Sequence, residues 1–153
     1  MLKKNVAGIE FVDPDINISW NLKEEDFVRL LKCDKKDSRF YLFKANLHPV
    51  GIDVINRISF HDSGFKMEII VSQTLVERPR DSKVIRINTH NTNFLHDYAE
   101  KKFGVPKCFS RIFSALEKPF YHYRWTFDHL KLFHKYQDSV IGFYECLLFE
   151  VKY

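Results

Sequence analysis

The chain has 153 residues, of which 45% are hydrophobic and 29% charged, and this composition is typical of one folded, soluble domain. A chain of this length buries roughly 70% of the surface that its unfolded form exposes, which argues against intrinsic disorder. The formal net charge of +4 permits an acidic partner or a nucleic acid without requiring either. We therefore expect residues 1–153 to form a single domain.

The cysteines and the apolar runs indicate a cellular compartment. Three cysteines, an odd number without close spacing, predict neither a disulfide framework nor a CxxC metal site. Cys108 and Cys146 lie among apolar neighbours and are expected to be buried free thiols. Neither an N-terminal apolar leader nor an apolar run of about 18 residues is found, so we expect a cytoplasmic protein without membrane association.

Short apolar or aromatic runs and alternation of apolar and polar residues predict five short strands in the first half of the chain. Fifteen phenylalanines against five glycines favour strands and aromatic packing over loops. A hairpin turn at His61-Asp62-Ser63-Gly64 is expected to join the last two strands. The predicted strands cover residues 6–12, 16–20, 40–44, 52–60 and 65–71.

One helix is expected among these strands. Asn21 precedes Glu24 by three residues, which is the spacing of a capping box. The helix is predicted to end near Cys33, before a polar run. Its buried stripe is expected to consist of Phe27, Val28, Leu30 and Leu31.

The second half is expected to contain two helices and an aromatic meander. Asn93 is a predicted N-cap, and Gly104 is predicted to end the first helix at residue 103. Pro106 is expected to open a second helix, in which apolar residues recur at helical spacing as far as Leu116. Strands are predicted at residues 84–87, 120–127, 130–136 and 140–151, with a turn at residues 137–139.

The strand at residues 120–127 separates its side chains by parity. Its odd-numbered aromatic residues are expected to lie in the core, with Trp125 at their centre. His122, Arg124 and the following Asp128 are expected on the outer face. Glu145 lies among apolar residues and is expected to face solvent or to be paired, because a buried carboxylate without a partner is costly.

Together these elements predict an α+β fold, with an antiparallel β-sheet meander and two or three helices packed on one face. Residues 1–76 and 84–153 show a similar order of elements and are consistent with two divergent helix–sheet repeats. Residues 94–106 and 121–150 resemble the helix–loop–helix–sheet unit of β-lactamase inhibitory protein and of small outer-membrane assembly lipoproteins. The stretches YRWTF, LKLFHKYQD and FYECLLFEV are similar to bacterial immunity proteins of polymorphic toxin systems. That resemblance implies a small cytoplasmic protein that binds another protein.

No stretch of the sequence carries a catalytic or cofactor motif. The histidine pairs His90/His96 and His129/His134 lack the spacing of HxxxH or HExxH, and no GxSxG, GxGxxG or Walker-type loop occurs. We therefore expect no enzyme, no metal and no cofactor. One alternative stays open, in which His122 and His134 approach each other across a hairpin beside a carboxylate.

By elimination, the sequence favours a cytosolic protein-binding module, and the resemblance implies most concretely an immunity protein that neutralises a cognate toxin by direct binding. The alternative is a nucleic-acid-binding protein or an enzyme with a dispersed His/Arg/Asp site; carboxylates interrupt the basic clusters and argue against nucleic acid. The candidate partner-binding residues are Arg78, Arg80 and Lys83 in the charged loop, and His122, Arg124 and Asp128 on the outer face.

Overall fold

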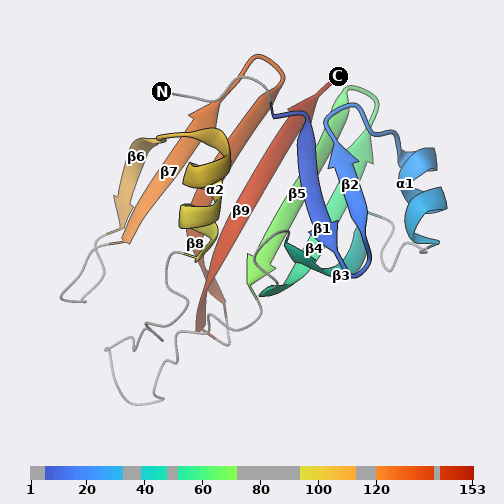
Figure 1. Ribbon diagram of the computed structural model, residues 1–153. Helices are drawn as coiled ribbons and strands as arrows, with labels where there is room; N and C mark the ends of the chain where they lie inside the picture. The colour runs from blue at the N-terminus through green and yellow to red at the C-terminus, as the bar shows by residue number, and fades with distance from the viewer. Residues whose placement is uncertain (1–5, 33–38, 48–51, 72–93, 113–119, 140–141) are drawn as a thin grey trace.

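The computed structural model describes residues 6–32, 39–47, 52–71, 94–112, 120–139 and 142–153 (Figure 1). Over these ranges the chain forms nine strands and two helices. In chain order they are β1 (Gly8–Val12), β2 (Ile16–Ser19), α1 (Glu24–Leu31), β3 (Tyr41–Leu47), β4 (Ile52–His61), β5 (Gly64–Val71), α2 (Phe94–Phe103), β6 (Lys107–Ile112), β7 (Phe120–Thr126), β8 (Leu130–Ser139) and β9 (Gly142–Lys152).

All nine strands belong to one antiparallel sheet, in the order β2-β1-β3-β4-β5-β9-β8-β7-β6. The C-terminal strand β9 therefore lies at the junction of the two halves of the chain, between β5 and β8 (Figure 1). This arrangement confirms an antiparallel α+β architecture. The division into two repeats stays a prediction.

One face of the sheet, called here the inner face, carries the hydrophobic core. The strand register aligns buried side chains in rows that run across the sheet, because alternate residues of each strand point to the same side. One such row consists of Tyr41, Ile58, Met67, Phe149, Leu132 and Trp125, each on a neighbouring strand. All six are buried, and each contributes about 1.5–3 kcal/mol through the apolar surface that it removes from water.

Helix α1 differs from the sequence prediction at its start. It begins at Glu24, after Lys23, and no side chain caps it. The capping box at Asn21 is therefore wrong, because the Asn21 amide oxygen instead accepts a hydrogen bond from the Ser19 hydroxyl at 2.7 Å. Phe27 is buried and its ring contacts Tyr41, Phe43 and Phe60, whereas Leu30 is 52% exposed and does not belong to the buried stripe.

Helix α2 forms where the sequence predicts it. It ends at Phe103, and Gly104 follows with a φ of 91° while its N–H donates to the Glu100 carbonyl. The Trp125 indole N–H donates to the Gly104 carbonyl at 2.6 Å, which ties the helix end to β7. The Phe103 ring contacts Trp20, Phe127 and Phe149.

Two predicted elements of the second half are wrong. Residues 107–112 form strand β6 instead of a helix, and β6 pairs with β7 through a bulge between Cys108 and Ser110. A short apolar run fits either period, and here the open edge of β7 selects the strand. Residues 137–139 are not a turn but the end of β8, where they pair with β9. Three further predictions fall outside the described residues, namely the part beyond residue 112 of the helix expected after Pro106, the strand at 84–87 and the cap at Asn93.

The parity prediction for β7 is confirmed at its centre. Trp125 is fully buried, and Tyr123 and Phe127 are partly buried against the core. Glu145 is fully buried and paired, which confirms the second of the two states expected for it.

Candidate functional site

The side of the sheet opposite the core, called here the outer face, carries most of the charged residues of the central strands. The same register that aligns the core also aligns these side chains in rows. One row runs through Leu42, Arg57, Glu68, Leu148, Phe133 and Arg124. A second row runs through Ser59, Lys66, Glu150, Lys131 and Thr126.

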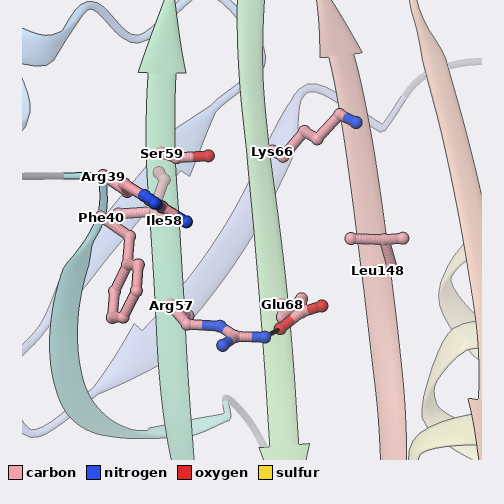
Figure 2. A pocket seen from close by; sticks show the side chains of 8 residues that line it. All are labelled: Arg39, Phe40, Arg57, Ile58, Ser59, Lys66, Glu68 and Leu148. Atoms are coloured by element: carbon pink, nitrogen blue, oxygen red, sulfur yellow. Dashed lines mark hydrogen bonds and ion pairs between the residues drawn. The ribbon is translucent and has the colours of Figure 1, made fainter.

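An open pocket of about 220 Å³ lies on the outer face, where the segment before β3 meets β4, β5 and β9 (Figure 2). It is lined by Arg39, Phe40, Arg57, Ile58, Ser59, Lys66, Glu68 and Leu148. In Figure 2, Arg39 and Ser59 lie on one side of the pocket and Leu148 on the other, and the ion pair of Arg57 with Glu68 crosses between β4 and β5. We call this the outer-face pocket.

The cations of the outer-face pocket differ in how far they are already engaged. The Arg57 guanidinium forms an ion pair and a hydrogen bond with Glu68, directly opposite on β5, and lies 5.3 Å from the centre of the Phe40 ring. The Lys66 ammonium is 3.7 Å from a Glu150 carboxylate oxygen, and its side chain is 58% exposed. Arg39 is exposed, and the described residues supply no ion pair for it.

A second polar cluster lies on the inner face, beneath the start of α2. The His134 Nε2–H donates to a Glu145 carboxylate oxygen at 2.7 Å, and the His96 backbone N–H donates to the same oxygen at 3.0 Å. The His134 side chain is 1% exposed and the Glu145 side chain is 0% exposed, so no solvent reaches the pair. The His96 ring lies 5.2 Å from the His134 ring and 4.3 Å from the Tyr123 ring.

This inner cluster has a structural role that follows from helix geometry. The first backbone N–H groups of a helix have no partner within it, and His96 is the third residue of α2. Glu145 supplies the missing acceptor from β9 and also places negative charge at the positive end of the helix. Within the described ranges no three His, Cys, Asp or Glu side chains are arranged to hold a metal ion.

The predicted approach of His122 to His134 is wrong. Strand pairing places Tyr123, not His122, opposite His134, so the two histidines point to opposite faces of the sheet. The actual partner of His134 is Glu145. The sequence holds a signal for this pair, because the other described inward positions of β8 and β9 are apolar. Their contact depends on the β8–β9 register, in which Glu145 lies diagonal to His134.

Cys146 confirms the expectation of a buried free thiol, although it lies on the outer-face side of β9 beside Ile70 and Lys135. Burial raises the pKa of the Cys146 thiol to about 12, and the nearby Glu68 carboxylate adds to that rise. A thiol with so high a pKa carries almost no thiolate at neutral pH, so Cys146 is not a nucleophile. The Cys108 side chain lies outside the described residues.

The structure separates the predicted partner-binding residues. Arg124 is exposed and His122 is half-buried on the outer side of β7, while Asp128 is exposed in the turn between β7 and β8. Two strands, β8 and β9, lie between Arg124 and the β5 residues of the outer-face pocket. The remaining three predicted residues, Arg78, Arg80 and Lys83, lie outside the described residues.

Comparisons with protein-family models, with characterised proteins and with solved structures find no match for this chain. Neither helix of the described ranges is long and apolar enough to cross a membrane.

Proposed function

We propose that the protein is a binding module that holds an acidic partner protein against the outer face of its sheet, and that it serves as an immunity protein which neutralises a cognate toxin. The observation that carries this proposal is the outer-face pocket, whose lining combines the cations Arg39, Arg57 and Lys66 with the apolar side chains of Phe40, Ile58 and Leu148. Both expected classes of contact, charge pairing and apolar burial, are therefore offered at one place on the surface.

The placement of the helices supports this choice of face. The ring contacts of α1 and α2 are with inner-face side chains, namely Tyr41, Phe43 and Phe149 among others. We infer that both helices pack on the inner face and leave the outer face to a partner. The outer rows contain half-buried apolar residues such as Leu148 and Phe133, which lose further surface to water when a second protein covers them.

The charges of the outer face favour an acidic partner. The carboxylates of the two outer rows, Glu68 and Glu150, are both engaged with cations of the same face, Arg57 and Lys66. A further basic residue, Lys131, is exposed on β8. An acidic toxin surface meets complementary charge here, which accelerates association and excludes basic competitors.

The inner cluster favours binding over catalysis. A general acid or base has to reach a hydrogen atom of the substrate, at about 2.6–3.2 Å between heavy atoms. His134 and Glu145 are almost completely buried, and their shared hydrogen bonds hold α2 in place. We therefore propose a structural role for this cluster and a binding role for the outer face.

The test uses the purified protein and the toxin encoded beside its gene, with affinity measured by isothermal titration calorimetry. Neutralisation of two outer-face cations, Lys66→Gln with Lys131→Gln, is expected to weaken binding by about tenfold and to reduce its salt dependence. The matched control is Arg29→Gln on α1, also an exposed cation, which should leave the affinity unchanged. A toxin that does not bind, or that binds the outer-face variant as tightly as the original protein, would refute the proposal.

A further inference from the structure

We infer that the outer-face pocket is an anchor site for a single carboxylate side chain of the partner protein, in which Arg39 is the contacting residue and Arg57 a positioning residue. The inference rests on the proposed function and names the chemistry that the partner presents. A neighbouring apolar side chain of the partner would lie on the Phe40 and Leu148 side chains, both of which are half-buried in the pocket lining.

Arg39 is the cation best able to accept a new partner. Arg57 is held from two directions, by the Glu68 carboxylate and by the Phe40 ring. Lys66 already lies within 3.7 Å of Glu150. Arg39 is exposed and has no ion pair with the described residues, and its guanidinium can bind both oxygens of one carboxylate.

Arg57 shapes the pocket without needing to touch the ligand. Its ion pair with Glu68 spans β4 and β5, as Figure 2 shows, and both residues line the pocket. Its guanidinium also lies over Phe40, and this contact keeps the aromatic ring at the pocket edge. Arg57 therefore acts on the ligand through the position of the Phe40 ring, while Arg39 binds the incoming group.

The charge balance favours a carboxylate over a phosphate group. Glu68 lines the pocket, and Glu150 lies next to Lys66 at its rim. A phosphate monoester carries almost two negative charges at neutral pH and is repelled by these carboxylates more strongly than a single carboxylate. Among the described residues Arg39 is the pocket guanidinium without an ion pair, and one guanidinium matches one negative charge. A nucleic-acid backbone, which needs several free cations in a line, is thus the less suitable occupant.

The experiment follows the backbone amides of Arg39 and Ser59 and the Arg39 Nε–H group by NMR during titration with defined probes. The probes are the capped dipeptide Glu-Leu, its Gln-Leu counterpart and inorganic phosphate. We expect saturable shifts with Glu-Leu, and an affinity lower by about fivefold in Arg39→Gln, as for an exposed ion pair. The matched control Lys44→Gln removes a cation from the same face outside the pocket lining and should leave the Glu-Leu affinity unchanged.

A second variant, Glu68→Gln, distinguishes a ligand site from a structural cluster. Loss of this carboxylate removes repulsion and frees Arg57, so the affinity for Glu-Leu should rise by about threefold, whereas a purely structural role predicts no gain. Equal binding of Glu-Leu and Gln-Leu, tighter binding of phosphate than of Glu-Leu, or equal effects of Arg39→Gln and Lys44→Gln would each overturn the inference. A toxin that binds normally to Arg39→Gln would refute the anchor while leaving the proposed function intact.

Discussion

Replacement of Glu145 tests whether one buried carboxylate holds α2 on the sheet. Glu145 accepts hydrogen bonds from the His134 ring and from the His96 backbone, and it is fully buried. Each hydrogen bond to a charged group contributes about 1.5–3 kcal/mol, and breaking a buried pair costs about 3–5 kcal/mol because the remaining partner stays unsatisfied. We therefore expect Glu145→Leu to lower the free energy of unfolding by about 3–5 kcal/mol.

A double-mutant cycle separates the pair from the packing around it. The double variant His134→Leu/Glu145→Leu leaves neither the imidazole nor the carboxylate buried without its partner. Its loss of unfolding free energy should therefore be about 2 kcal/mol smaller than the sum of the losses in the two single variants. The free energy of unfolding is measured by guanidinium denaturation with fluorescence of the buried Trp20 and Trp125 as the signal. The control Glu25→Gln, at an exposed position of α1, should change stability by less than about 0.5 kcal/mol.

The hydrogen bond between Glu145 and the start of α2 can be tested separately by amide hydrogen exchange. If Glu145 supplies the acceptor for the start of α2, exchange of the His96 amide hydrogen should accelerate in Glu145→Leu even under conditions in which the protein stays folded. Additive single effects, with a coupling below about 0.5 kcal/mol, or unchanged exchange at His96, would refute the role assigned to this carboxylate.

Three further predictions concern the fold. Gly64 has a φ of 154°, and a Cβ there would collide with the Val151 carbonyl on β9. In denaturant unfolding, Gly64→Ala should therefore lower the free energy of unfolding by about 2–4 kcal/mol. A decrease no larger than that of the control Ser63→Ala would contradict this. Trp125→Phe removes the hydrogen bond to Gly104 and leaves a void, so the free energy of unfolding should fall by about 2–4 kcal/mol. An unchanged free energy of unfolding would contradict a role for this hydrogen bond. Burial raises the pKa of Cys146 from its ordinary 9.0 to about 12, so the unfolded chain loses the thiol proton at a lower pH than the folded chain. The free energy of unfolding should therefore fall between these pH values, relative to that of Cys146→Ala. Parallel pH profiles of the two proteins would contradict the raised pKa.

Local patterns in the sequence were sufficient for most of the strands. Short apolar or aromatic runs and period-two alternation located eight of the nine strands of the sheet, and alternation arises because one face of a strand is buried whatever the strand pairs with. Neighbouring residues also sufficed to predict the hairpin at His61–Gly64 and the end of α2 at Gly104, since a glycine with positive φ lies at both. Parity also placed Trp125 in the core.

Another feature required the tertiary structure. The run at residues 107–112 fits a helix or a strand, and the available edge of β7 decides between them. There a local helix preference was outweighed by strand pairing, which the sequence does not reveal. The error at Asn21 has a local cause instead, because its side chain accepts a hydrogen bond from the Ser19 hydroxyl two residues earlier.

By itself the sequence determined an antiparallel, aromatic-rich sheet with charged residues on alternate positions, because side-chain period follows from backbone geometry alone. The tertiary structure decided which strands are neighbours. Placing β9 between β5 and β8 brings Glu145 to His134 on one face and Leu148 to Glu68 on the other. The pocket and the helix contact both arise from that order, since strand pairing joins residues that are far apart along the chain.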